Sequence, residues 1–124
     1  MPSMEDGRFY FGVEKAEEPK VTVRGTVSIE DPKPLNRLVE EIHAYILSRG
    51  YRQVTVDVRQ LEFMNSTGFK PLVLWLERIM GCPESSRYTL HFLSSPARRW
   101  QPVFLSALSC FAPTQVTIEA AAPK

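Results

Sequence analysis

The hydrophobic pattern of this chain changes its period at one four-residue turn, and that change constrains the fold more than any other feature. Before the turn, residues 54–58 read Val-Thr-Val-Asp-Val, which is typical of a short buried strand. After it, apolar side chains recur every three or four residues from Gly68 to Met80, as on an amphipathic helix that ends at Gly81 and Pro83. A strand that leads directly into such a helix predicts a βα unit, and therefore a sheet with parallel strands.

The same two patterns of apolar spacing, one typical of strands and one of helices, predict the positions of the other elements. A helix is predicted to begin at Asp31 and Pro32, which suit a helix start, and to end at Gly50, which suits a left-handed cap. Its apolar face consists of Leu35, Leu38, Val39, Ile42 and Ile46. A further helix is predicted near residues 100–111, with Pro102 in its first turn. Strands rich in β-branched and aromatic residues are predicted at residues 8–13, 21–29, 88–93 and 115–119.

These elements follow one another in the order β-β-α-β-α-β-α-β, which predicts an α/β fold. We expect a mixed β-sheet with an N-terminal hairpin and parallel later strands, and three main helices packed on the sheet. The 124 residues suffice for one hydrophobic core. A single domain over residues 1–124 is therefore predicted, with loose termini at residues 1–7 and 120–124.

Composition and charge argue against several classes of function. Fifteen basic and fourteen acidic residues give a net charge of +1, which provides no overall attraction to nucleic acid or to an anionic membrane. The sequence holds no apolar run of about 20 residues that would span a membrane, and its first residues lack a signal-peptide pattern. Cys82 and Cys110 are expected to be free thiols. We therefore expect a cytoplasmic protein with no nucleic-acid partner, no membrane insertion, no metal and no cofactor.

The residues around the turn resemble the signature of STAS domains, the module of bacterial anti-sigma-factor antagonists. In that family a buried strand leads to an Asp-Ser-Ser/Thr-Gly turn and then to an amphipathic helix; here the turn reads Asn65-Ser66-Thr67-Gly68. The match covers residues 54–79, and the chain is also similar to a bacterial STAS-like subgroup with Asn in this turn. The resemblance implies a STAS-like fold and a regulatory protein–protein interaction, with an anti-sigma-factor-type serine/threonine kinase as the partner.

By motif position, the resemblance implies that Thr67 accepts a phosphate, with Ser66 as the neighbouring hydroxyl. In the family the unphosphorylated form binds the partner, and phosphorylation releases it. The partial positive charge of a helix N-terminus would tolerate a phosphate here. Asn65 stands where the family has an acid, so a carboxylate that a kinase or a metal-bound nucleotide would contact is missing. The alternative interpretation of the turn from Asn65 to Gly68 is a plain helix cap, worth about 1 kcal/mol.

One side of the helix after the turn is predicted to bind the partner. Its spacing directs six apolar residues toward the sheet, namely Phe69, Leu72, Val73, Leu76, Ile79 and Met80. The opposite side carries Lys70, Pro71, Leu74 and Arg78, with Trp75 at the boundary. An exposed leucine and tryptophan beside basic residues predict a docking patch. The alternative is an ordinary surface with scattered apolar residues.

Catalysis is not expected. Ser66 or Thr67 at a strand-to-helix turn suggests a nucleophile, with His43 or His91 as its base. However, the Gly-x-Ser-x-Gly frame is absent, and neither histidine has an evident orienting acid. His43 is predicted to be a solvated surface residue, and His91 a satisfied core or edge residue.

The alternative function is the sensing of a small ligand or a lipid without phosphorylation. It requires only a pocket, which the sequence does not reveal. The aromatic residues Trp100 and Phe104 are predicted to belong to the core and not to form a stacking platform for bases.

Overall fold

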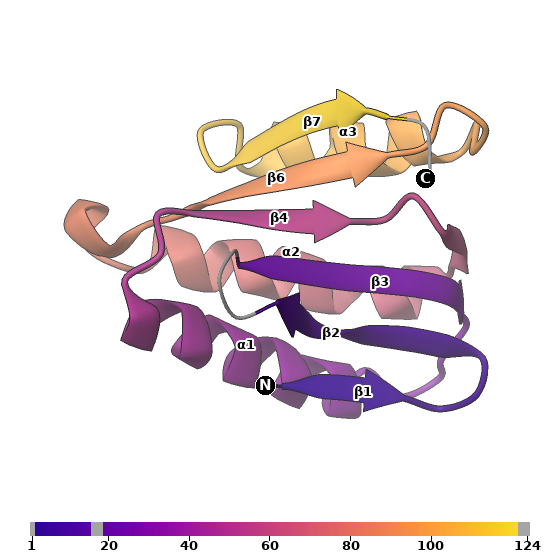
Figure 1. The fold of residues 1–124 in the computed structure, drawn as a ribbon, viewed down its shortest axis with the longest axis horizontal. Helices are drawn as coiled ribbons and strands as arrows, with labels where there is room; N and C mark the ends of the chain where they lie inside the picture. The colour runs from indigo at the N-terminus through magenta and orange to yellow at the C-terminus, as the bar shows by residue number, and fades with distance from the viewer. Residues whose placement is uncertain (1, 16–18, 122–124) are drawn as a thin grey trace.

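The computed structural model describes residues 2–15 and 19–121 and folds them into one mixed sheet and three α-helices (Figure 1). The strands are β1 (Ser3–Glu5), β2 (Phe9–Lys15), β3 (Lys20–Val27), β4 (Gln53–Asp57), β5 (Leu61–Met64), β6 (Thr89–Ser94) and β7 (Val116–Ala120). The helices are α1 (Lys33–Arg49), α2 (Ser66–Met80) and α3 (Gln101–Phe111), with a short 3-10 turn, η1 (Glu84–Ser86). The strand order is β1-β2-β3-β4-β6-β7, and β5 pairs with β3.

The directions of the strands confirm the predicted α/β class. The first three strands are antiparallel neighbours, whereas β3, β4, β6 and β7 run parallel to one another. Parallel neighbours need a crossover connection, and each of the three crossovers here contains one α-helix. The predicted N-terminal hairpin, parallel later strands and three helices are therefore present. The predicted order lacked two strands, β1 and β5.

The expectation that residues 1–7 are loose is wrong for β1. Ser3 lies opposite Gly12 of β2, and Val13 donates a backbone hydrogen bond to the carbonyl of Pro2 over 3.0 Å. A Cβ atom at position 12 would lie 2.3 Å from the Cβ of Ser3, so the glycine makes room for this edge strand. At the other end of the chain, Ala120 belongs to β7, and residues 122–124 lie outside the described residues.

The second unpredicted strand, β5, shares a partner with β4. The first half of β3 pairs with β4, and its second half pairs with β5, starting from Gly25 opposite Leu61. The residues between β4 and β5 therefore leave the sheet and return to it. The four residues of β5 alternate too little to be recognised as a strand from the sequence alone.

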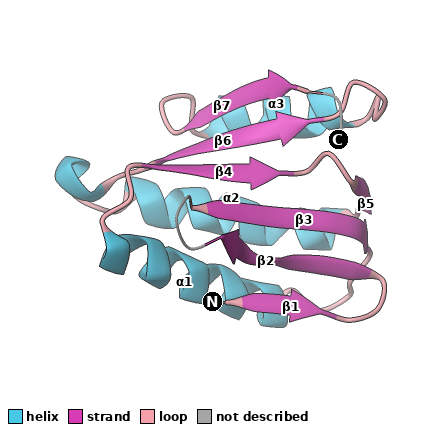
Figure 2. Cartoon of the chain, in the orientation of Figure 1, coloured by secondary structure: helices cyan, strands magenta, loops and turns pink. Residues whose placement is uncertain are grey.

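All three helices cover the same face of the sheet, behind it in the view of Figures 1 and 2. Within the described residues the opposite face carries no helix. Strand residues that point toward the helices, such as Phe11, Val23, Val54, Val56 and Phe92, are at most 1% exposed and form the core. In the described part of the chain, no helix has both the length and the apolar character needed to cross a bilayer.

The helix α1 closely follows its sequence signals. It begins one residue later than predicted: Pro32 occupies the N-cap position, and Asp31 Oδ1 accepts a hydrogen bond from the backbone N–H of Lys33 over 3.1 Å. It ends at Gly50, whose φ of +68° is the left-handed conformation that glycine adopts without strain. All five predicted core residues are buried, which are Leu35, Leu38, Val39, Ile42 and Ile46.

Candidate functional site

The turn before α2 is built around Asn65, which is the N-cap of the helix. Its Oδ1 accepts a hydrogen bond from the backbone N–H of Gly68 over 2.8 Å, and its Nδ2 donates to the carbonyl of Ile29 over 2.8 Å. Its backbone N–H donates to the carbonyl of Val27 over 2.9 Å. The predicted cap is thus confirmed, and the same side chain fastens the start of α2 to the segment that follows β3.

Gly68 brings the first turn of α2 close to the sheet. A Cβ atom at this position would lie 2.7 Å from Val27 Cγ1, which is closer than real Cβ contacts come. The glycine of the turn is therefore required by packing, because any side chain would push the helix away from β3.

The two hydroxyl residues of the turn differ in exposure. Ser66 is exposed and Thr67 is half-buried, and both lie in the first turn of α2. No acidic residue occupies that turn. The predicted acceptors thus stand at the positive end of a fifteen-residue helix, and the more accessible hydroxyl is that of Ser66.

The predicted docking patch on α2 is not a continuous surface. Trp75 is fully buried and Pro71 is also buried, whereas Lys70 and Arg78 are exposed and Leu74 is half-buried. The prediction was wrong for Trp75 and Pro71 because it assumed that only the sheet covers α2. In the structure α2 lies between α1 and α3, so it is covered on its flanks as well (Figure 1).

Two contacts fix the orientation of α2. Trp75 Nε1 donates a hydrogen bond to Tyr88 Oη over 2.7 Å inside the core, and Arg78 pairs with Glu40 of α1 at 2.6 Å. The helix α2 is rotated about its axis relative to the prediction, so two residues expected to face the sheet do not. Met80 is 39% exposed, and Phe69 packs edge-on against Phe104 of α3 at 5.1 Å between ring centroids. The Lys70–Arg78 side of α2 therefore offers a weaker candidate than its N-terminal end.

An apolar groove of about 450 Å³ lies beside the turn, between α2 and α3. Ser66 and Asn65 border it on one side. The apolar side chains that line it are Met64, Phe69, Trp100, Val103, Phe104 and Ala107. Trp100 and Phe104 pack against the core as predicted, but both are only partly buried and also face this groove.

The outer surface of α3 carries no charge. Residues 100–118 contain no Asp, Glu, Lys, Arg or His, and Val103 is 76% and Phe111 43% exposed. Surface helices normally carry charged side chains, and the cores of protein interfaces are depleted in them. Sequence reasoning missed this surface, although an uncharged stretch of this length was a usable signal.

His43 is not the solvated residue that was predicted. Its Nδ1 lies 2.7 Å from Tyr88 Oη, and the side chain is half-buried. Because Trp75 donates to the same hydroxyl, the buried Tyr88 hydroxyl needs an acceptor for its own proton, and His43 Nδ1 provides it. The proton of neutral His43 is thereby assigned to Nε2, 3.7 Å from Cys82 Sγ.

The pKa values of His43 and Tyr88 are shifted in this chain of contacts. Burial, assisted by the positive charge of Arg78, lowers the pKa of His43. Burial raises the pKa of the Tyr88 hydroxyl, against the opposing effect of the hydrogen bond from Trp75. The contacts end at Cys82, beyond the C-terminus of α2, so about 22 Å of helix separates that end from the turn at Asn65.

His91 lies on the face of the sheet that carries no helix. Its Nδ1 is 2.6 Å from Thr117 Oγ1, and its Nε2 is 3.1 Å from Glu119 Oε1. His91 is satisfied as predicted, but it is neither a core nor an edge residue, because β6 lies between β4 and β7 and the side chain is partly exposed. Glu119 is an acid partner that the sequence did not reveal. The structure therefore brings neither His91 nor His43 to Ser66 or Thr67.

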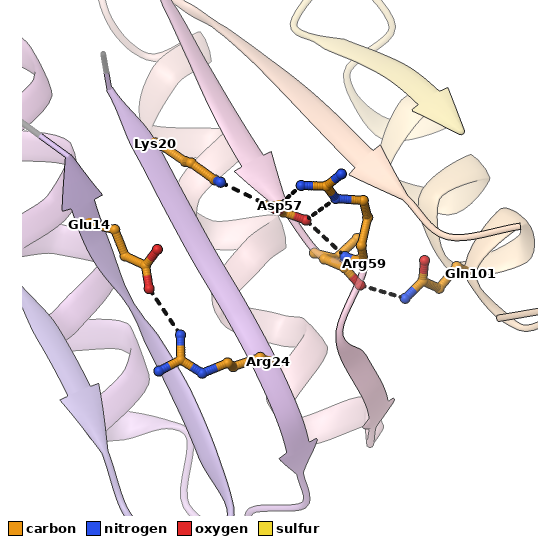
Figure 3. A network of polar contacts seen from close by, with 7 residues as sticks. Glu14, Lys20, Arg24, Asp57, Arg59 and Gln101 are labelled. Carbon is orange, nitrogen blue, oxygen red and sulfur yellow. Dashed lines mark hydrogen bonds and ion pairs between the residues drawn. The ribbon is translucent and has the colours of Figure 1, made fainter. Parts of the chain in front are cut away.

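A polar network on the helix-free face was also missed (Figure 3). Arg59 Nη2 lies 2.8 Å and Lys20 Nζ 3.4 Å from Asp57 Oδ2. Burial alone would raise the pKa of Asp57, but the hydrogen bonds and charge of Arg59, with the charge of Lys20, outweigh it and lower the pKa. The signal for this network was Asp57 at the end of a run of valines, followed two residues later by Arg59.

Comparison with known proteins adds no assignment. No protein-family model matches the chain, and no curated protein matches it in sequence. The resemblance to STAS domains therefore stays a prediction that rests on the turn and on the order of the elements.

Proposed function

We propose that this chain is a regulatory protein–protein interaction module that binds its partner on the apolar groove beside the turn. The observation that carries the proposal is the uncharged outer surface of α3, with Val103 76% exposed, next to the exposed hydroxyl of Ser66. An apolar surface of this kind is costly to expose to water unless a partner covers it. The resemblance to anti-sigma-factor antagonists and the STAS-like topology that it implies fit such a role.

The charges around the groove indicate the chemistry of the partner. Lys70 follows Phe69 in the sequence, and Arg99 precedes Trp100; both basic side chains are exposed. The groove itself is apolar. A partner protein that presents an apolar segment with acidic residues at its edges would match this surface in both respects.

Phosphorylation of Thr67 or Ser66 would act on this interaction through charge. A phosphate adds about −1.5 to −2 charges, which the N-terminus of α2 tolerates without unfolding. At the border of the groove, the same charge would repel the acidic edge of the partner. The domain would then stay folded in both states, and only its affinity for the partner would change.

A photo-crosslinking amino acid at position 103 tests the proposal in cells of the source organism. The matched control carries the same amino acid at position 47, because Leu47 is also an exposed apolar residue but lies on α1. We expect a protein that crosslinks from position 103 and not from position 47. Mass spectrometry then identifies it, and the purified partner is titrated against the domain.

Substitutions separate the surface from the switch in that titration. Val103→Asp should weaken binding at least tenfold, whereas Leu47→Asp should leave the affinity unchanged. Ser66→Glu and Thr67→Glu should weaken binding while the domain remains folded by circular dichroism. Equal affinities for the wild type and Val103→Asp would refute the assignment of the surface. Normal binding by both glutamate variants would refute the phosphorylation switch alone.

A further inference from the structure

A second candidate site lies on the face of the sheet that carries no helix. It is a hollow of about 660 Å³, within the range of small-molecule sites, where four segments meet. These segments are the β1–β2 turn, the middle of β3, the β4–β5 connection and the β6–α3 connection. Its charged lining residues are Arg8, Arg24, Arg59, Arg98, Glu5 and Glu62. Four arginines and two glutamates thus line one opening.

Two of these arginines are held in place by contacts of their own. Arg59 is hydrogen-bonded to both carboxylate oxygens of Asp57, over 2.9 and 2.8 Å (Figure 3). Arg24 pairs with Glu14 at 2.9 Å and stacks over the ring of Tyr10 at 4.3 Å. Planar guanidinium groups fixed in this way are suited to binding phosphate or carboxylate groups.

The other two arginines differ in this respect. Among residues 2–15 and 19–121, neither the Arg8 nor the Arg98 guanidinium forms a hydrogen bond or an ion pair, although both residues line the hollow. Arg8 comes from the β1–β2 turn and Arg98 from the β6–α3 connection. Donors that approach one space from separate segments are available to a ligand that enters between them.

A buried glutamine fixes the two connections that border the hollow. Gln101 is fully buried; its Nε2 donates to the carbonyls of Val58 and Leu61 over 2.7 and 3.1 Å. Its Oε1 accepts from the backbone N–H of Ser95 over 3.0 Å. One side chain therefore joins the connection that carries Arg59 to the one that carries Arg98, so the site is held in shape before any ligand arrives.

The floor beside the hollow contains an unsatisfied polar group. A smaller hollow of about 240 Å³ also includes Arg24, Arg59 and Thr22 in its lining. Thr22 is 9% exposed, and its Oγ1 has no hydrogen-bond partner among the described residues. Buried hydroxyls are normally hydrogen-bonded, so this atom is a polar group left without a partner beside the arginines that the two hollows share.

We propose that this hollow binds a small molecule that carries two or more phosphate or carboxylate groups. Anionic groups that are spaced apart would pair with Arg8 and Arg98 at the opening, while Arg59 and Arg24 form the fixed wall. The groove between α2 and α3 is a separate surface, so binding here does not depend on the partner protein.

Titration of the isotope-labelled protein by NMR tests this proposal. The probes are pyrophosphate for phosphates, citrate for carboxylates, and acetate as a single-charge control. Pyrophosphate, citrate or both should cause saturable shifts of the amides of Gly7, Gly25, Gln60 and Ala97, all of which belong to the lining. Acetate should shift them only weakly, because it has one charged group. The anion that saturates identifies the ligand class.

Matched substitutions distinguish a site from general charge attraction. The double variant Arg8→Gln, Arg98→Gln should bind the saturating anion at least tenfold more weakly. The control Arg37→Gln, Arg49→Gln removes the same charge from exposed arginines outside the lining, and it should bind like the wild type. Absence of saturable shifts with both polyanions, or equal weakening in the two double variants, would overturn the proposal.

Discussion

The side-chain amide of Asn65 donates a hydrogen bond to the backbone carbonyl of Ile29 over 2.8 Å, a contact that a carboxylate at this position would lack. The other end of the amide accepts from Gly68, so the cap uses a donor and an acceptor at once. The aspartate of the resembled motif has only acceptors when it is ionised. The Asn in this turn is therefore explained by the path of the chain after β3, independently of any phosphorylation.

Replacing Asn65 with aspartate should destabilise the fold at neutral pH. A carboxylate keeps the bond from Gly68 but places an anionic oxygen against the carbonyl of Ile29, which costs about 1–3 kcal/mol. A protonated carboxyl can donate to that carbonyl, so part of the loss should be recovered at pH 4. Urea unfolding at both pH values measures the difference. Gln53→Glu, the same change at an exposed strand position, is the control; equal losses in the two variants would contradict the role given to Ile29.

Local signals were sufficient to predict α1 and the cap of α2. The ends of α1 are determined by Asp31, Pro32 and Gly50, which act on their immediate neighbours, and its buried face follows from helical spacing alone. Asn65 likewise caps through a residue three positions away. Such interactions join residues that lie within a few positions of one another, so a single sequence reveals them.

The missed features depend on distant partners. The strand β5 forms because β4 pairs with only the first half of β3, which lies more than thirty positions earlier in the chain. The second half of β3 is therefore available to pair with β5. The burial of Trp75 depends on Tyr88 and on the helices at either side of α2. The residues near Trp75 in the sequence do not indicate that these distant elements will cover it. Spacing therefore predicted the helix but not its rotation, and for this reason the docking surface that we propose is the groove and not the Leu74 side.

The burial of His43 beside Arg78 predicts that stability declines in mild acid. Folding lowers the pKa of His43 below its ordinary value of 6.5, so the unfolded chain binds more protons once the pH falls below about 6.5. The free energy of unfolding should then decrease toward lower pH, through the folded pKa. Chemical unfolding between pH 5 and 8 measures this slope, and His43→Gln, which cannot titrate, should flatten it.

The pH window keeps this prediction separable from the titration of Asp57. Asp57 also has a lowered pKa, but its contribution is lost only as the pH falls below 3.8, outside the window of His43. A slope that persists in His43→Gln would show that another group is responsible.

Replacing Tyr88 with phenylalanine should be costly even though no volume is lost. The indole N–H of Trp75 would stay buried without an acceptor, which costs about 1–3 kcal/mol. The control is Tyr45→Phe, at a half-buried tyrosine of α1, where a change within about 0.5 kcal/mol is expected. Urea unfolding measures both, and similar values would indicate that the Tyr88 hydroxyl contributes nothing to the core.

The loss of the buried amide in Gln101→Leu should loosen the two connections around the hollow as well as lower stability. The carbonyls of Val58 and Leu61 and the N–H of Ser95 would each lose the hydrogen bond to Gln101, although the Val58 carbonyl keeps the one from the Leu61 N–H. We therefore expect a loss of about 3 kcal/mol. Gln101→Glu keeps the acceptor for Ser95 but not the donor. Hydrogen exchange at the Ser95 amide should therefore accelerate strongly in the leucine variant and less in the glutamate variant. Equal protection of that amide in wild type and Gln101→Leu would mean that the connections are positioned by their backbones, and that Gln101 does not shape the site.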